Sequence, residues 1–412
     1  MSISWANIDS YKGNYSSPEL LSYRQCPICA SPRNKTVMVL NDFLHYTDST
    51  VKPKLVEIHQ RQCRDCYAIY MNPCYSSYGF KVLFEEAGQS YILNKTDEQI
   101  EWLKNKVNLT DGIKLLDVGC HNGMFLSKLP DYVKRTGIDI NQSAIEDGRR
   151  RFRDAGIELI CDDFETFQYQ ATPDVITMFN VLEHFPRPLI VLRNLRSMAH
   201  PSTRLIVEVP LLENGITKDI NGFLSVHHLT HFSRNSLENC LLQAGWQIIE
   251  QDEQAHYNGC RISAIPSKAV LTIKGEIGDI KQLYKYFSAY YDSLQSANAV
   301  IEQHPIEAHC VIWGGGTHTE ILYHTTSLFH ANRRKYIIVD SDPLKQGKTW
   351  RGIKIYSPTV LKSIDWANAN LIVSSYGSQE AILREALKLN VPKSKIILFY
   401  SRSSDKEYRR EC

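Results

Sequence analysis

No apolar run in the sequence is long enough to span a lipid bilayer, and neither sign of charge dominates. The 47 Lys and Arg residues nearly balance the 45 Asp and Glu residues, which leaves a formal net charge of +2. A chain without a strong basic excess is a poor candidate for nucleic-acid binding. The first 17 residues also lack the apolar core of a secretory signal. We therefore expect a cytoplasmic protein without a membrane or nucleic-acid partner.

The sequence also lacks the cysteine spacing of a disulfide framework. Of its eleven cysteines, seven are scattered and four form two C-x-x-C pairs, which is typical of a reduced compartment. The paired residues are Cys26, Cys29, Cys63 and Cys66. Two such pairs supply the four thiolates of a structural Zn²⁺ site, and strand-like segments at 36–41 and 55–60 would carry them. The alternative is four thiols without a metal.

Residues 114–129 combine a strand, a glycine turn and the start of a helix. The strand contains Asp117, and the turn runs from Gly119 to Gly123. Glycines let the backbone approach a ligand closely, and the helix N-terminus offers free N–H groups to it. The spacing is not that of a dinucleotide fingerprint, because His121 occupies the position of the second glycine. D-x-G-x-x-x-G is the pattern of class I methyltransferases, which bind S-adenosylmethionine.

Strands and helices alternate after this motif, as in a doubly wound α/β sheet. We expect helices at 141–155 and after Pro188, and strands at 135–140, 157–161, 173–180 and 204–209. Asp139 follows Asp117 at the distance where a carboxylate accepts the ribose hydroxyls of a nucleoside. Either Asp162 or Asp163 is placed to accept the adenine amine, or to cap the next turn.

The order of these pieces over residues 115–210 resembles the class I, Rossmann-like methyltransferase core. The resemblance implies an S-adenosylmethionine site at the carboxyl ends of the strands. The expected cofactor-binding residues are Asp117, Gly119, Cys120, His121, Asn122, Gly123, Asp139, Ile140, Asp162, Asp163, Asn180, Val181 and His184.

Three histidines, His227, His228 and His231, occur within five positions after the last of these strands. A histidine titrates near neutrality and is suited to act as a general base. A metal site would use His227 and His231 at i and i+4, but no third ligand with suitable spacing is visible. The alternative is that the histidines only lead into a helix at 237–244, which Ser233 caps.

A second strand, glycine turn and helix begin at His309. Gly314 to Gly316 follow the strand, but the third glycine of a dinucleotide fingerprint is missing, so NAD is not expected. Strands at 335–339 and 371–375 bring further polar turns to the same edge, where ligands bind in open parallel sheets. The candidate substrate-binding residues at this edge are Gly316, Thr317, His318, Asp340, Lys348 and Tyr376. The alternative is a Rossmann-like domain that serves only as a lid or a dimer surface.

The expected organisation has four parts: a zinc-binding module at 1–80, the methyltransferase core at 81–268, a helical connector at 269–305 and the C-terminal Rossmann-like α/β domain at 306–412. Together they resemble the sugar C-methyltransferase family, which methylates dTDP-linked 4-keto-6-deoxy sugars. Residues 339–348, VDSDPLKQGK, are similar to the family signature V-D-x-N-P-x-K-Q-G-K. The glycine loop is similar to its G-S-N-D-G loop, and residues 180–182 match its N-N-V-L turn.

The resemblance implies that a histidine removes a proton beside the sugar ketone, and that the carbanion takes the sulfonium methyl. His228 falls on this base, and Tyr91 matches an upstream tyrosine that takes part. His227 replaces a family glutamate, and Ser225 and His231 replace two tyrosines near the substrate. Thr319 and Glu320 stand where the family's second glycine turn has a lysine.

These differences leave the acceptor sugar open, and also whether carbon or oxygen is methylated. The sequence therefore predicts an S-adenosylmethionine-dependent methyltransferase acting on a nucleotide-activated sugar, with His228 as the base. The alternatives are an RNA methyltransferase with a zinc module and a non-catalytic protein that binds S-adenosylmethionine or a nucleotide. The oligomeric state is not indicated by the sequence.

Overall fold

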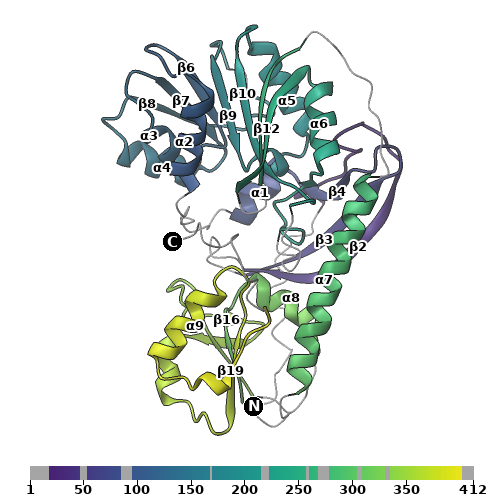
Figure 1. Cartoon of the computed structure of the whole chain (residues 1–412), viewed down its shortest axis with the longest axis vertical. Coiled ribbons are helices and arrows are strands. Elements are labelled where there is room, and N and C mark those ends of the chain that lie inside the picture. Colours follow the sequence, from purple (N-terminus) through teal and green to yellow (C-terminus); the bar gives the residue numbers. More distant parts are fainter. Residues whose placement is uncertain are drawn as a thin grey trace.

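A computed structural model of the chain describes residues 18–46, 53–84, 95–167, 169–214, 222–256, 259–267, 278–303, 309–329 and 335–400. It has an upper lobe with a large sheet and a lower lobe with a smaller one (Figure 1). The long helix α7 (Gly278–Glu302) and the strands β2 and β3 run between the lobes. None of the helices in these residues combines the length and apolar character needed to cross a membrane. Tyr91 lies outside the described residues.

The upper lobe is built on a seven-stranded sheet of order β12-β13-β10-β9-β6-β7-β8. Its strands are β6 (Lys114–Val118), β7 (Lys134–Asp139), β8 (Ile157–Cys161), β9 (Val175–Phe179), β10 (Arg204–Pro210), β12 (Trp246–His256) and β13 (Gly259–Pro266). The strands β6 to β10 pair in parallel, and their bounds agree within two residues with those expected. The doubly wound fold is therefore confirmed, whereas the antiparallel hairpin of β12 and β13 was not foreseen.

Helices cover this sheet (Figure 1). They are α2 (Lys95–Lys106), α3 (Met124–Ser127), α4 (Gln142–Arg151), α5 (Pro188–Met198) and α6 (Arg234–Gln243). α6 begins three residues earlier than expected because the Ser233 side chain accepts a hydrogen bond from the Ser236 N–H and caps the helix there. The sheet interior is apolar, with Leu116, Ile176 and Ile206 fully buried.

The N-terminal module comprises residues 18–84. Its elements are β1 (Leu21–Ser22), β2 (Asn34–His45), β3 (Lys54–Cys63), β4 (Ile69–Met71), β5 (Cys74–Tyr75) and α1 (Ser77–Phe84). The hairpin of β2 and β3 reaches from the upper lobe to the lower one (Figure 1). The strands β2, β3 and β4 form a four-stranded sheet together with β11 (Thr230–His231). β11 pairs antiparallel with β4 and comes from the histidine-containing loop of the upper lobe. The module and that loop therefore share one sheet.

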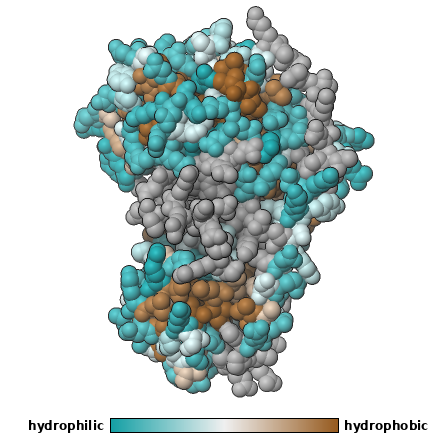
Figure 2. Space-filling model, viewed as in Figure 1, coloured by the Kyte–Doolittle hydropathy of each residue, from teal (hydrophilic) through white to brown (hydrophobic). Residues whose placement is uncertain are grey.

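The lower lobe is the C-terminal domain, residues 309–400. Its sheet has the order β16-β17-β15-β14-β18-β19 and is parallel except for the pair of β16 and β17. The strands are β14 (His309–Trp313), β15 (Tyr336–Val339), β16 (Thr349–Trp350), β17 (Ile353–Tyr356), β18 (Ala369–Val373) and β19 (Ile396–Ile397), and the helices are α8 (Thr317–Thr325) and α9 (Gln379–Lys388). The expected Rossmann-like arrangement is present. Figure 2 shows an apolar patch on this lobe. The exposed large hydrophobic side chains of the C-terminal domain include Leu344, Tyr356 and Leu387.

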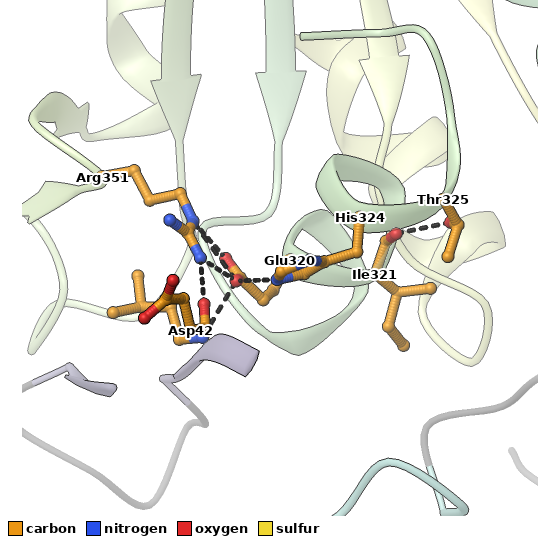
Figure 3. A network of polar contacts seen from close by, with 7 residues as sticks. Asp42, Glu320, Ile321, His324, Thr325 and Arg351 are labelled. Atoms are coloured by element: carbon orange, nitrogen blue, oxygen red, sulfur yellow. Dashed lines mark hydrogen bonds and ion pairs between the residues drawn. The ribbon is translucent and has the colours of Figure 1, made fainter. Parts of the chain in front are cut away.

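A buried ion pair joins β2 to the C-terminal domain (Figure 3). Arg351 donates from Nε to Oε2 of Glu320 at 2.9 Å, and both residues are at most 3% exposed. Glu320 also accepts hydrogen bonds from the Leu44 N–H and from His324, each at 2.9 Å, while Arg351 donates to the Asp42 carbonyl. Glu320, which replaces the lysine of the similar family, therefore holds two parts of the chain together.

We expect Glu320→Ala to lower the free energy of unfolding by about 3–5 kcal/mol, because it leaves Arg351 buried without its counter-charge. Urea unfolding followed by circular dichroism measures this change. Glu385→Ala is the control, since Glu385 forms an exposed pair with Lys388 and its removal should change stability by less than about 1 kcal/mol. Equal effects of the two variants would contradict a structural role for the Glu320 pair.

Candidate active site

The loop after β6 turns sharply because three of its residues have left-handed backbone angles: φ is 78° at Gly119, 50° at His121 and 77° at Gly123. A Cβ atom on Gly119 would lie only 2.4 Å from Cγ2 of Val181. Gly119 is therefore required by its φ angle and by the close packing of the loop after β9. This packing brings two of the predicted cofactor segments together.

Asp139 lies at the end of β7, beside the glycine loop. Its Oδ2 accepts a hydrogen bond from the His121 N–H and its Oδ1 from the Asn141 N–H, each at 2.8 Å. Burial raises the pKa of Asp139, and these two N–H groups partly offset the rise. Each carboxylate oxygen has a second lone pair. The position fits the two ribose hydroxyls of a nucleoside.

Asp117 is buried one strand away, where the Thr177 hydroxyl donates to its Oδ1 at 2.6 Å. Burial raises the pKa of Asp117 to about 7, and the nearby charge of Asp139 adds to this effect. A cation at this edge would favour the ionised carboxylate. S-adenosylmethionine carries both an ammonium and a sulfonium group, so the acidic edge fits its charge.

The side chains between the glycines hold the loop against its neighbours. A Cβ atom on Gly137 would lie 2.6 Å from Sγ of Cys120, and one on Gly148 would lie 2.2 Å from the carbonyl oxygen of Asn122. The Asn122 Oδ1 accepts from the Met124 N–H at 3.3 Å, at the start of α3. Cys120 and Asn122, predicted for cofactor binding, therefore also have structural contacts that the sequence did not reveal.

Asn180 begins the next turn and is tied to β10. Its N–H donates to the Glu208 carbonyl at 2.8 Å, and its Nδ2 donates to Oε1 of Glu208 at 3.2 Å. Glu208 in turn forms a buried ion pair with Arg261 at 2.7 Å. This network fixes the start of the segment that leads to His184.

The two acids after β8 have different surroundings. Asp163 accepts from the Glu165 N–H at 2.9 Å and from the Ser77 hydroxyl at 2.5 Å, so it caps the turn that follows. Asp162 is exposed. Of the two candidates for the adenine amine, the geometry therefore favours Asp162. Ile140 is 43% exposed at the end of β7 and offers an apolar surface to a purine ring.

Asp139→Ala should weaken S-adenosylmethionine binding by roughly 1.5–3 kcal/mol, the usual contribution of hydrogen bonds to a charged group. Titration calorimetry measures the dissociation constant. Asp154→Ala is a suitable control because Asp154 is exposed to solvent and precedes β8, at the opposite end of that strand from the candidate cofactor site. An unchanged dissociation constant in the Asp139 variant would exclude this residue from the cofactor site.

Three histidines from two segments form a cluster, which we call the histidine cluster: His184, His227 and His228. The ring centroids of His184 and His227 are 5.0 Å apart, those of His184 and His228 are 5.2 Å apart, and those of His227 and His228 are 5.0 Å apart. His184 ends the short 3₁₀ helix η2 (Leu182–His184) after β9. A backbone hydrogen bond of 2.8 Å from Leu229 N to Glu183 O joins the two segments.

His231 lies apart from this group. It is part of β11, and its ring stacks on Phe223 with centroids 4.5 Å apart. The sequence suggested that His227 and His231 form a metal-binding pair because of their i and i+4 spacing. The structure instead groups His227 with His184 and His228. That spacing assumes a helix, whereas residues 227–231 lead into a strand. The sequence also gave no sign that His184, more than 40 residues earlier, joins the cluster.

The histidines of the cluster are held in their neutral form. Burial lowers the pKa of His227 to about 4, and it holds the pKa values of His184 and His228 well below the ordinary value. Their mutual proximity lowers the pKa of His184 and of His228 further. At neutral pH each imidazole therefore has a nitrogen lone pair that can accept a proton or bind a metal ion.

Arg24 connects the histidine cluster to the N-terminal module. Its Nε donates to the Met71 carbonyl at 3.1 Å, its Nη1 to the Pro186 carbonyl at 2.5 Å, and its Nη2 to the Leu229 carbonyl. These carbonyls belong to β4 and to the two segments that carry the histidines. Arg24 lies two residues before Cys26. Apart from this nearness to the cysteine pair, the sequence did not indicate that Arg24 links the two segments.

The four paired cysteines form a cysteine cluster. Sγ of Cys26 is 3.5 Å from that of Cys66, and Sγ of Cys29 is 3.6 Å from that of Cys63. Zinc–sulfur bonds of about 2.3 Å in a tetrahedron place the sulfurs about 3.8 Å apart, so the cluster fits zinc. Hydrogen bonds from Cys26 and Cys66, together with backbone N–H groups, hold the pKa of Cys63 well below its ordinary value.

The cysteine cluster also packs against the upper lobe. Ile28, between two of the cysteines, is fully buried, and its carbonyl accepts a hydrogen bond from Nε2 of Gln243 in α6 at 2.7 Å. The buried cysteines share one apolar core with strands β6, β9 and β10. A metal bound here would stabilise the contact between the module and the upper lobe.

The C-terminal domain gathers its candidate residues at the carboxyl edge of β14, β15 and β18. Asp340 accepts from the Gly315 N–H at 2.8 Å, and His318 hydrogen-bonds to Ser374 at 3.0 Å. Burial lowers the pKa of His318 to about 4. The lysine at the glycine turn is Lys345 and not the predicted Lys348. Nζ of Lys345 would be 3.1 Å from a Cβ atom on Gly316.

Thr317 begins α8 directly after the glycine turn, so it also lies at this edge. Tyr376 follows β18, and its ring lies 4.7 Å from that of Tyr400, which also contacts His318. The carbonyl of Lys348 accepts from the Ile355 N–H at 2.8 Å, which places its backbone in the turn toward β17. The edge therefore contains most of the predicted substrate-binding residues.

Comparison with known proteins identifies the upper lobe. Residues 94–251 match the methyltransferase domain family. The chain contains a class I methyltransferase domain. This family supports S-adenosylmethionine as the methyl donor, and the residues around Gly119 and Asp139 fit its charged and polar parts.

Curated relatives match about a quarter of this chain. The ubiquinone biosynthesis O-methyltransferase of Aeromonas salmonicida is 27% identical over 114 residues, which are 26% of this chain and 48% of the relative. The enzyme of the same name from Histophilus somni is 29% identical over 121 residues, 27% of this chain and 49% of the relative. The chain thus spans about half the length of the curated relatives it matches.

Solved structures resemble less than half of the chain, at low sequence identity. An S-adenosylmethionine-dependent methyltransferase from Clostridium acetobutylicum is 12% identical, with a TM-score of 0.36 and coverage of 46% of this chain and 97% of that one. A chain from the complex between the Haloferax volcanii Trm112 methyltransferase activator and a methyltransferase is 13% identical, with a TM-score of 0.39 and coverage of 42% and 91%.

Proposed function

We propose that the protein transfers a methyl group from S-adenosylmethionine to a nucleotide-activated sugar. The observation that carries this proposal is the end of β2, which lies between the histidine cluster and the glycine turn of the C-terminal domain. The ring of His45 is 6.4 Å from that of His227, and the carbonyl of the next residue, Tyr46, would be 3.2 Å from a Cβ atom on Gly316. Two neighbouring residues thus contact both candidate sites.

An activated sugar has two chemically different ends, and the two sites suit them. The glycine turn at the start of α8 suits a diphosphate because it lies at a helix N-terminus, and the buried Lys345, which pairs with Asp340 at 3.8 Å, adds a positive charge beside it. The histidine cluster lies next to the methyl-donor loop and suits the reacting part of the sugar. The similarity of residues 339–348 to the sugar C-methyltransferase signature agrees with this assignment.

In this proposal His228 acts as the base. Its neutral imidazole accepts the proton from the carbon beside a sugar ketone, or from a hydroxyl group. When bound, S-adenosylmethionine supplies the methyl group at its sulfonium centre. His227 hydrogen-bonds the acceptor, and Asp139 and the glycine loop position the nucleoside. The cysteine cluster binds a structural Zn²⁺, which requires the reducing conditions of the cytoplasm.

A second candidate function is O-methyl transfer to a hydroxyl group of another small molecule. The likeness of residues in the methyltransferase domain to ubiquinone biosynthesis O-methyltransferases favours it. An RNA acceptor is less well supported, because the net charge is only +2.

The test uses S-adenosylmethionine labelled in its methyl group, offered with one acceptor at a time. The acceptors are a dTDP-4-keto-6-deoxy sugar, its 4-hydroxy counterpart, a hydroxylated quinone precursor and a short RNA. We expect label on the keto sugar, and deuterium beside the ketone should wash out into solvent. Label on the quinone precursor alone would replace the first proposal with the second.

A further inference from the structure

His184, His227 and His228 form a set of three possible metal ligands that the spacing of the sequence did not indicate. One ring nitrogen from each of His184, His227 and His228 lies within 4.8 Å of the others. We propose that these residues bind a divalent transition-metal ion such as Zn²⁺, in a three-histidine site that leaves a coordination position for an oxygen ligand. This site is separate from the cysteine cluster and has a different donor set.

Each of the three rings has a polar partner outside the cluster. Oε1 of Glu183 lies 3.6 Å from Nε2 of His184, and the Ser225 hydroxyl lies 2.9–3.0 Å from the ring nitrogens of His227. The backbone of Gly222 lies near the ring of His228, since a Cβ atom on Gly222 would be 3.8 Å from its Nδ1. Metal-binding histidines characteristically donate their second N–H to such a carboxylate, hydroxyl or carbonyl group.

The electrostatics also suit a cation. Glu183 is only 1% exposed and places a carboxylate beside the site. Three imidazole nitrogens favour Zn²⁺ and its transition-metal neighbours over Mg²⁺ or Ca²⁺, which prefer oxygen ligands.

The position of the site indicates its use. η2 follows Val181, which packs on Gly119 of the methyl-donor loop. An ion here can bind the carbonyl or hydroxyl oxygen of an acceptor and lower the pKa of its proton. This role rests on the proposed function, whereas ion binding does not. An ion would also use the lone pair of His228, so this residue acts either as a ligand or as the base, and not as both at once.

Cobalt binding tests the proposal without an acceptor. Reduced protein is freed of metal and then titrated with Co²⁺, which should fold the N-terminal module as it fills the cysteine cluster, while metal content and the visible spectrum are measured. We expect two equivalents: one with the thiolate charge-transfer band of the cysteine cluster, and one with only the weaker bands of nitrogen and oxygen ligands. His184→Ala and His227→Ala should each weaken the binding of the second Co²⁺ ion by more than about 100-fold. Substitutions outside the set of metal ligands typically weaken metal binding by at most about 100-fold.

His200→Ala is the control, because His200 bonds to Asp174 away from the cluster and should keep both equivalents. An unchanged thiolate band shows that each variant remains folded. Uptake of a single equivalent by the wild-type protein, or of two by the His227 variant, would overturn the proposal. If the ion binds but no sugar is methylated, only the proposed function fails. If protein that holds metal in the cysteine cluster alone methylates the sugar at the full rate, the ion at the histidine cluster has no part in catalysis.

Discussion

His228→Asn is expected to lower turnover by roughly 10²–10⁴-fold, the range for removal of one general base. Asparagine keeps a polar side chain but cannot accept the proton that a neutral imidazole accepts. The dissociation constant of S-adenosylmethionine should stay nearly unchanged, because the nucleoside contacts lie around Asp139. Initial rates with the labelled methyl donor, together with calorimetry, separate the two quantities.

His200→Asn is the matched control for this substitution. His200 bonds to Asp174 at 3.0 Å, just before β9 begins. It therefore lies at the amino ends of the parallel strands, opposite the edge that carries the histidine cluster. Wild-type turnover in the His228 variant would show that the histidine cluster only leads the chain into β11. Loss of turnover in the His200 variant would show that the effect is not local.

Cys63→Ser is expected to prevent the N-terminal module from folding. Binding of structural zinc contributes about 10–16 kcal/mol at neutral pH, which is as large as the whole stability of a typical domain. The loss should extend to the methyltransferase domain, because β4 pairs with β11 and Arg24 binds the carbonyls of Pro186 and Leu229. Melting temperature, zinc content and turnover should therefore all fall together.

The control for this change is Cys161→Ser, at an exposed cysteine outside the cluster. It should keep the zinc that the cysteine cluster binds and should melt like the wild-type protein. A Cys63 variant with unchanged metal content and melting temperature would contradict a zinc site at these residues.

Local patterns in the sequence predicted the elements of the fold well. The strand from Lys114 to Val118 is a short apolar run, and apolar runs of this length indicate buried strands. The glycine turn was visible because Gly119 has a φ angle that other residues rarely adopt. The cysteine pairs were visible because each C-x-x-C spacing is typical of a metal-binding turn, and the structure brings the four thiols together.

Contacts between distant segments could not be read from the sequence. The pairing of β4 with β11 uses backbone groups, which every residue has, so no residue type marks it. His184 joins His227 and His228 only because two loops meet in space. In the sequence, Thr319 and Glu320 only stood where the similar family has a lysine, and the buried pairing of Glu320 with Arg351 became visible only in the structure.

The apolar cores that join the N-terminal module, the methyltransferase domain and the helix α7 were also not visible in the sequence. One apolar core contains Cys26 and Ile28 together with strands of the methyltransferase domain. A second combines residues of β2 and β3 with Phe223 and with Tyr286 of α7. Segments that are separate along the chain thus share their cores.

The sharing of a sheet by β4 and β11 has a consequence for synthesis on the ribosome. Tyr70 pairs with Thr230, about 160 residues later in the chain. At ~5–20 residues per second, the edge of β4 waits roughly 8–30 s for its partner strand. During this time the unpaired edge is open to other strands, a hazard for aggregation. Early zinc binding would fix the cysteine pairs around β3 and β4 and so reduce incorrect strand pairing. The zinc supply during translation should therefore govern the yield of correctly folded protein.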